Sequence, residues 1–286
     1  MLDVIVGGAL LGALFSLIAV GLNLEYGVTR ILNIAHGEFL MVGSYITYLF
    51  FTFYGVNPLV SLVLSGPIVF VLGILIQVIV FRKLVRLSKS AEELEFRSLL
   101  ACFGLQFIIQ NVVRSIFGST YIGTPYLMEI ISIWGEGFQL NRIIAAVLAV
   151  VISIILYMLL RSTKFGLAMR AAVEEPTGAQ LVGISIFKIH AVSFGLGALL
   201  SALAGSMLAM IQTNITPFIG PQFTFIALAI IVLGGMGSFT GSLIGGFIIG
   251  YINYVSYKIE PLMSMVVVYV FLIILLIIKP KGLFGR

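Results

Sequence analysis

The chain has 286 residues, of which 60% are hydrophobic and 9% are charged, and its mean hydropathy is +1.20. A water-soluble core of ordinary size does not bury so much apolar sequence, so the composition predicts an integral membrane protein. The net charge of +5 does not indicate nucleic-acid binding, because the basic residues gather in a few loops without interleaved aromatic residues. Cys102 is the single cysteine, which excludes an internal disulfide or a cluster of thiolate metal ligands.

Windows of roughly 20 apolar residues, the length that crosses a bilayer as a helix, recur along the chain. They cover residues 4–24, 31–53, 59–81, 98–117, 143–160, 191–211 and 262–278. Residues 223–257 are long enough for two passes, but the glycine-rich run 234–241 interrupts them and leaves a first half too short to span alone. The prediction is an all-α membrane protein of one domain, residues 1–286, with eight to nine transmembrane segments, some of them broken.

The placement of Lys and Arg predicts how the helices are oriented. Basic residues occur in the segments 82–97, 161–188 and 279–286, and none occur in 54–58, 118–141 or 212–222. By the positive-inside rule the first set faces the cytoplasm and the second set faces outward. These assignments alternate along the chain if the N-terminus is outside and the C-terminus is cytoplasmic.

Small and polar residues predict how the helices pack. Gly197, Ser201 and Gly205 repeat at four-residue spacing, as do Gly246 and Gly250. Such spacing favours close approach of helix backbones in lipid, and a ligand passage lined by bare backbone is the alternative.

One predicted helix carries a polar face. Gln106, Gln110 and Arg114 share that face, with Asn111 beside it. Such a stripe is expected to form interhelical hydrogen bonds or to line a pathway, and Arg114 alternatively reaches the outer interface.

Two segments interrupt the apolar sequence at membrane depth. The first, residues 33–38, follows a kink expected at Tyr26 and Gly27, and the second is the run 234–241. Paired breaks in the two halves of a chain are typical of transport proteins built from inverted repeats, in which the broken helices meet near the midplane. The predicted pathway residues are Asn33, His36, Glu38, Gly234, Gly235, Gly237 and Ser238.

His36 and Glu38 admit several roles at that break. They hydrogen-bond the unwound backbone and hold its shape, or they line the substrate path, or they relay protons. The only other histidine, His190, lies in a predicted cytoplasmic loop, so no metal cluster is expected. Catalytic motifs such as His-Glu-x-x-His and Gly-x-Ser-x-Gly are missing from the sequence, and no enzyme activity is predicted.

The sequence resembles one family over essentially its whole length. The elements that carry the resemblance are Gly-Leu-Asn-Leu-Glu-Tyr-Gly from Gly21, Asn-Ile-Ala-His-Gly-Glu from Asn33, and Ile-Val-Leu-Gly-Gly-Met-Gly-Ser from Ile231. Together they resemble the LivH/LivM-type permeases, the membrane subunits of ABC importers for branched-chain amino acids.

The resemblance implies a division of labour in the inner membrane of a prokaryotic cell. It implies a second permease subunit, paralogous or a second copy of this chain, two cytoplasmic ABC ATPase subunits and an extracytoplasmic binding protein. The chain has no Gly-x-x-x-x-Gly-Lys-Ser/Thr loop, so no cofactor is expected on it, and ATP and magnesium belong to the partner ATPases. The implied substrates are leucine, isoleucine and valine.

The resemblance also places an ATPase-coupling loop at residues 161–190. Arg170, Glu174, Glu175 and Gly183 are its expected contacts with the ATPase. ABC importers often carry Glu-Ala-Ala-x-x-x-Gly here, whereas this chain has Thr-Gly-Ala at 177–179 and keeps only the glycine, which leaves the contacts less specified. The alternatives are a solvated loop at this place, an ion-coupled secondary transporter, or an ABC permease for urea or short amides.

Overall fold

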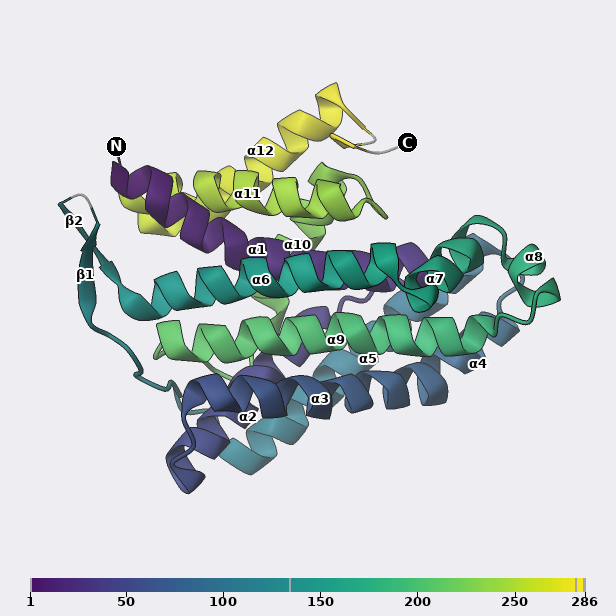
Figure 1. Cartoon of the computed structure of the whole chain (residues 1–286), viewed down its shortest axis with the longest axis horizontal. Helices are drawn as coiled ribbons and strands as arrows, with labels where there is room; N and C mark the ends of the chain where they lie inside the picture. Colours follow the sequence, from purple (N-terminus) through teal and green to yellow (C-terminus); the bar gives the residue numbers. More distant parts are fainter. Residues whose placement is uncertain (1, 134, 281, 285–286) are drawn as a thin grey trace.

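A computed structural model describes residues 2–133, 135–280 and 282–284, and Figure 1 shows a bundle of long helices. The elements in chain order are α1 (Leu2–Thr29), α2 (His36–Tyr54), α3 (Pro58–Ile76), a π-helical turn (Gln77–Phe81), α4 (Arg82–Leu87), α5 (Ala91–Phe117), β1 (Ile130–Ile133), β2 (Glu136–Gln139), α6 (Leu140–Ser162), α7 (Lys164–Glu174), α8 (Pro176–Leu181), α9 (Ile186–Ile211), α10 (Gly220–Gly234), α11 (Phe239–Ile259), a 3₁₀ turn (Pro261–Met263) and α12 (Ser264–Ile278). The chain is therefore a helical membrane protein, as the composition predicts.

Among the described residues, seven helices are long and apolar enough to cross a membrane. The predicted count of eight to nine is approximate, because the two further segments are α2 and α10, which differ from the rest. α2 carries His36 and Glu38 in its first turn, and both are buried. α10 has 15 residues, so at 1.5 Å per residue it is about 22 Å long. That is shorter than the bilayer core of about 30 Å.

Both α2 and α10 begin at buried residues in the interior of the bundle. α1 ends at Thr29, Arg30 adopts a φ of 56°, and an extended segment leads back to the buried start of α2 at His36. The kink expected at Tyr26 and Gly27 is wrong, because α1 continues through both residues. Gly27 instead lets α1 approach a turn, since a Cβ on it would lie 3.4 Å from the Cα of Gly237.

The two halves of the chain repeat one arrangement in opposite directions. α9 is followed by an extended segment and by α10, as α1 is followed by an extended segment and by α2. α1 packs most extensively against α11, and α9 correspondingly against α3. α1 and α9 run in opposite directions, as the colours and labels of Figure 1 show. This is the inverted repeat that the sequence predicts.

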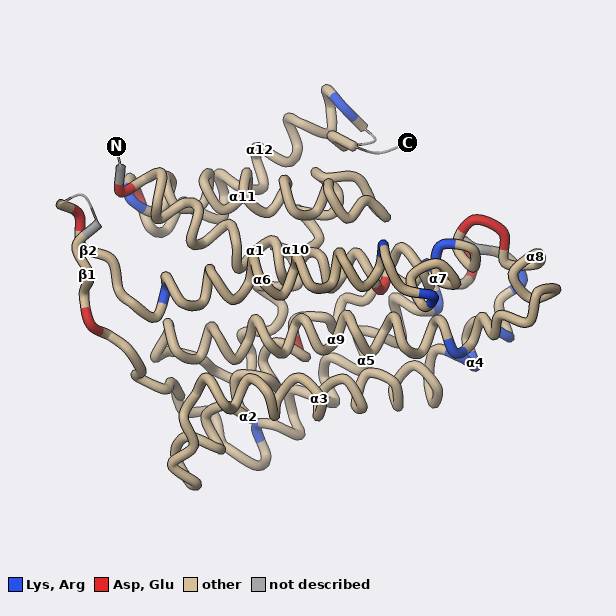
Figure 2. Tube along the Cα trace, viewed as in Figure 1, with Lys and Arg blue, Asp and Glu red and all other residues tan. Residues whose placement is uncertain are grey.

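The two ends of the bundle differ in charge. The start of α1 and the β1–β2 hairpin lie at one end, and α4, α7 and α8 lie at the other (Figure 1). Figure 2 shows that most Lys and Arg residues gather at the second end. The hairpin, with Ile131 opposite Phe138, is a small β-element that the all-α prediction did not include. At the N-terminal end Lys258 forms an ion pair with Asp3, so this basic residue is neutralised locally.

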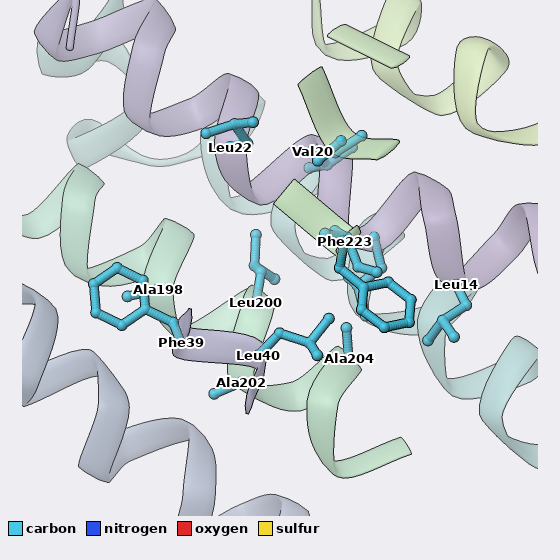
Figure 3. Close-up of a cluster of buried hydrophobic side chains, with 14 of the residues drawn as sticks. Leu14, Val20, Leu22, Phe39, Leu40, Ala198, Leu200, Ala202, Ala204 and Phe223 are labelled. Carbon is cyan, nitrogen blue, oxygen red and sulfur yellow. The ribbon is translucent and has the colours of Figure 1, made fainter. Parts of the chain in front are cut away.

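The helices meet at small residues around an apolar core. Figure 3 shows Leu14 and Leu22 of α1, Leu40 of α2 and Phe223 of α10 gathered around α9. A Cβ on Gly205 of α9 would lie within 1.9 Å of the carbonyl oxygen of Leu40, and a Cβ on Gly246 of α11 within 2.5 Å of the Cα of Ser16. The packing role predicted for the spaced small residues is therefore confirmed.

The glycine contacts generate a first prediction. Gly205→Ala should lower the free energy of unfolding by about 1–3 kcal/mol, because its methyl group overlaps the backbone of α2. Gly104→Ala in α5 is the matched control, since a Cβ at this helical position meets no atom within 4 Å. The control should be neutral or stabilise by about 0.5–1 kcal/mol, the usual gain in a helix. Unfolding of the two purified variants in detergent measures both effects, and equal stabilities would contradict the packing.

Candidate functional site

A buried polar cluster joins the end of α1 to the start of α2. Glu25, Asn33 and His36 are each fully buried, with 0% of their surface exposed. One carboxylate oxygen of Glu25 accepts a hydrogen bond from the Asn33 side-chain amide at 2.8 Å, and the other lies 3.0 Å from Nδ1 of His36. The cluster therefore ties the extended segment between the helices back onto α1.

The contacts of His36 define where its protons are. Nε2 lies 3.1 Å from the carbonyl oxygen of Ile18, which can only accept, so Nε2 carries a proton and donates it. On the other side of the ring, Nδ1 faces Oε1 of Glu25, so both ring nitrogens have protein partners.

The starts of α2 and α10 meet at the same place. The backbone N–H of Gly37 donates to the hydroxyl of Thr224 at 2.8 Å, and the hydroxyl of Ser201 in α9 donates to the carbonyl of His36 at 2.9 Å. A Cβ on Gly37 would lie 1.9 Å from the carbonyl oxygen of Gly220, so the two helix starts are in direct backbone contact. Polar side chains thus satisfy backbone groups that lipid would leave unpaired.

Glu38 lies across this junction. Its carboxyl group accepts a hydrogen bond from Nε2 of Gln110 at 2.8 Å, and it packs against Gly220, the first residue of α10. Glu38 therefore links α2, α5 and α10.

The other residues of the predicted polar face on α5 lie in different surroundings. Gln106 is 9% exposed and lies on the buried side with Gln110. Asn111 is exposed and bonds the carbonyl of Phe107 in its own helix, and Arg114 stacks over the ring of Phe218. The interhelical hydrogen bond is thus made by Gln110 alone among these four.

The second predicted pathway segment, residues 234–238, lies away from the junction of α2 and α10. The side chain of Asn23 accepts from the N–H of Gly237 at 2.6 Å and donates to the carbonyl of Ser238 at 2.7 Å. Asn23 and Gly27 face this turn, whereas Glu25, two residues from each, points to the opposite side of α1. The expectation that residues 33–38 and 234–238 meet is corrected here, because α1 lies between them.

The partner of the first break is the start of α10. Gly220 and Thr224 occupy it, and α10 then runs about 21 Å before reaching Gly234 and Gly235. The glycine run was the stronger sequence signal, but it forms the turn between α10 and α11. Gly220 and Pro221 are the signal that marks the true break, since proline favours the first turn of a helix.

The predicted coupling residues lie at the basic end. Arg170 donates to the carbonyl of Leu160, and with Glu174 it lines a cavity of about 650 Å³ that also includes Gly237. Glu175 is exposed between α7 and α8, and Gly183 follows α8 with a φ of 85°. The structure thereby places two predicted coupling residues beside one predicted pathway residue.

The described part of the chain contains no candidate metal-binding cluster. No three His, Cys, Asp or Glu residues there lie together as a possible metal site. Glu25 and His36 instead use both of their polar ends on protein partners.

Comparisons with known proteins agree on one family. The family described as the permease component of the branched-chain amino acid transport system matches residues 4–276. The permease proteins LivH of Salmonella typhimurium and of Escherichia coli K12 are each 30% identical, over 98% of this chain and 94% of theirs. The probable LivH permease of Methanocaldococcus jannaschii is 32% identical over 85% of this chain and 77% of its own. No solved structure matches.

The polar cluster generates a second prediction. Glu25→Ala should lower the free energy of unfolding by about 3 kcal/mol or more, because it leaves Asn33 and His36 buried without their shared partner. Glu95→Ala is the control, since Glu95 is exposed near the start of α5. Thermal unfolding of both variants in detergent gives the comparison. A Glu25→Ala protein as stable as the control would show that the cluster does not hold the break.

Proposed function

Because the chain belongs to the family of branched-chain amino acid transport permeases, we propose that it is the membrane-spanning permease subunit of an ABC importer. It translocates leucine, isoleucine and valine delivered by an extracytoplasmic binding protein. The observation that carries the proposal is the family match over nearly the whole chain, supported by a bundle whose seven described spans and two interior helix starts suit a transport protein. Relatives named for branched-chain amino acids do not favour an ion-coupled carrier or a urea permease.

Energy for transport comes from other subunits in this proposal. The sequence lacks the phosphate-binding loop of an ATPase, so ATP and magnesium are bound by two partner ATPase subunits. A second permease subunit, paralogous or identical, completes the membrane part. No nucleic acid is involved, and the remaining partner is the lipid bilayer.

The segment α7–α8 is the proposed contact with the ATPase. Leu181 and Val182 are 85% and 76% exposed at its tip, beyond the ends of the membrane spans. Adjoining apolar side chains that are exposed outside lipid are a candidate protein contact. Gly183 closes the tip in the left-handed region, where a side chain is strained.

The proposed orientation in the membrane is based on the basic residues at the same end of the molecule. The basic end with α4, α7 and α8 is cytoplasmic, and the end with the hairpin and the N-terminus is outside.

For the break at residues 33–38, the contacts of Asn33 and His36 support a role in holding the shape of the helices. Glu38 keeps one carboxylate oxygen without a partner among the described residues.

The proposed function is tested by reconstitution. Proteoliposomes containing the chain with its cognate permease and ATPase partners should accumulate labelled leucine, isoleucine and valine when receptor and ATP are supplied. Urea and acetamide are the comparison solutes. Uptake that ignores ATP and disappears with an ionophore would instead establish a secondary carrier, because ion gradients would then drive it.

Coupling gives a third prediction. Replacing Leu181 and Val182 with Ser should weaken ATPase binding at least about tenfold, since each loses apolar surface that the contact would bury, worth about 1.5–3 kcal/mol per side chain. The fold should be unchanged because neither side chain is buried. The control replaces Ile277 and Ile278 with Ser. These residues lie at the end of α12 and are similarly exposed, at 78% and 73%. Co-purification with the ATPase and the rate of ATP turnover measure the effect. Normal ATPase binding by the Leu181 and Val182 variant would show that this tip is not the contact.

Orientation gives a fourth prediction. In a Cys102→Ala background, a cysteine at Ser132 in the hairpin should react with an impermeant thiol reagent from outside. A cysteine at Gln180 in α8 should react only from the cytoplasmic side, because these residues lie at opposite ends of the bundle. The reversed pattern of labelling would invert the assignment.

A further inference from the structure

A groove that opens to the membrane lies between α6 and α11. Both helices pack on α1, but not extensively on each other. Between them lies a cavity of about 290 Å³, with Ala13 of α1 in its floor and Val150 and Ile154 of α6 in its wall. The exposed residues on this part of α6 are those of a lipid-facing helix: Val147, Val150, Val151, Ile154, Ile155, Tyr157 and Met158.

The groove continues into the cavity of about 650 Å³ at the basic end. Tyr157 of α6 lines both cavities, and its ring packs on that of Phe239 in α11 with 5.5 Å between the centroids. We call the two cavities together the α6–α11 groove. Its lining on α6 extends from Val150 to Arg161, which is about 17 Å of helix. The hydrocarbon core is about 30 Å thick, so the groove has about the depth of one lipid leaflet.

Two guanidinium groups border the groove where it reaches the membrane surface. Arg161 is the penultimate residue of the α6 span, and Arg170 lies in α7 just beyond it. Neither forms an ion pair with an acidic residue in the described part of the chain. Arg161 donates to the hydroxyl of Tyr157 at 2.6 Å, and Arg170 donates to the carbonyl of Leu160. A guanidinium has five N–H donors, so most of them remain for a ligand.

We propose that the α6–α11 groove binds an anionic phospholipid, with its phosphate at Arg161 and Arg170 and one acyl chain between α6 and α11. Guanidinium groups bind phosphate through paired N–H donors, and basic sites between transmembrane helices at the membrane surface bind acidic headgroups. The two arginines and the Glu174 carboxylate on the same cavity leave one positive charge, which matches a headgroup with one negative charge. The hydroxyls of a glycerol headgroup can donate to Glu174.

The deep part of the groove suits an acyl chain and not a soluble ligand. Its walls are mostly apolar, and the hydroxyls of Ser16 and Ser153 donate to the carbonyls of Leu243 and Ala149. A lipid enters sideways from the bilayer, because the groove opens on the exposed face of α6. A protein helix is about 10 Å across with its side chains, which is too wide for a cavity of about 290 Å³.

The bound phosphate connects two helices. Its oxygens accept from Arg161 of α6 and Arg170 of α7, and Met169 and Val173 of α7 line the same cavity. Occupation of the groove therefore holds α7 against the end of α6. This connection does not depend on the proposed transport function.

Retention of defined lipids tests the headgroup contacts. Delipidated protein in detergent receives equal amounts of dioleoyl phosphatidylglycerol and dioleoyl phosphatidylcholine, and native mass spectrometry counts the bound lipid. Phosphatidylglycerol should be retained at least about fivefold over phosphatidylcholine, because basic residues at a membrane surface favour anionic headgroups by about 1 kcal/mol each. Arg161→Gln combined with Arg170→Gln should abolish the preference, and both residues are exposed, so the fold should persist.

The matched control is Lys83→Gln combined with Arg86→Gln. It removes the same charge from α4 at the basic end, at two exposed residues outside the groove, and should keep the preference. Equal retention of the two lipids by the unmodified protein, or equal loss of preference in both double variants, overturns the proposal.

A photoreactive lipid tests the position of the acyl chain. Phosphatidylglycerol with a diazirine in the middle of one chain should label α6 and α11 at least about fivefold more than α3 at Val71 and Leu75, because the groove holds the chain in place. Those two residues are exposed outside the groove, in the half of α3 that leads to the basic end. Excess glycerol 3-phosphate should leave the labelling unchanged. Even labelling of the three helices overturns the acyl position, and competition by glycerol 3-phosphate would assign the arginines to a soluble phosphate ester and overturn the lipid site.

Discussion

The structure depends on pairing backbone groups where helices begin inside a membrane. The first N–H groups of a helix have no partner within it, and lipid offers none. α2 and α10 both begin in the interior, and side chains supply what water would supply elsewhere: Asn33 accepts from the N–H of Ala35, and Thr224 from that of Gly37. Glu25 serves this need indirectly, because it anchors the Asn33 and His36 side chains.

The inverted repeat brings the two helix starts together. α1 and α9 cross at glycines, since a Cβ on Gly21 would lie 3.0 Å from the carbonyl oxygen of Gly197. That crossing brings the extended segments that follow α1 and α9 to the same centre. α1 at 67% and α9 at 78% are the most buried of the seven spans. The centre is consequently the most tightly constrained part of the molecule, and motion during transport is easier at its edges.

Much of the fold could be predicted from the sequence because bilayer constraints act on every residue. Apolar windows predicted most of the helices, and the charged residues at 25–38 predicted a polar break. The location of its partner could not be predicted in this way. Gly234 and Gly237 interrupt hydropathy strongly, whereas Gly220 lies in a stretch without charge that also reads as an outer loop. Spacing alone also cannot show which face of α1 a residue occupies relative to distant segments, and Asn23 and Glu25 face opposite partners.

The same geometry separates the support of the fold from the segment proposed to couple to the ATPase. Buried hydrogen bonds resist changes of shape, because breaking them leaves unpaired groups. The cavity of about 650 Å³ at the basic end is lined by Met169 and Val173 of α7, and the buried side chains of Glu25 and His36 do not line it. The proposed ATPase contact at the end of α8 connects to this wall directly through α8 and α7. The glycine turn at Gly237 borders the same cavity, so the strongest glycine motif of the sequence lies beside the proposed coupling segment.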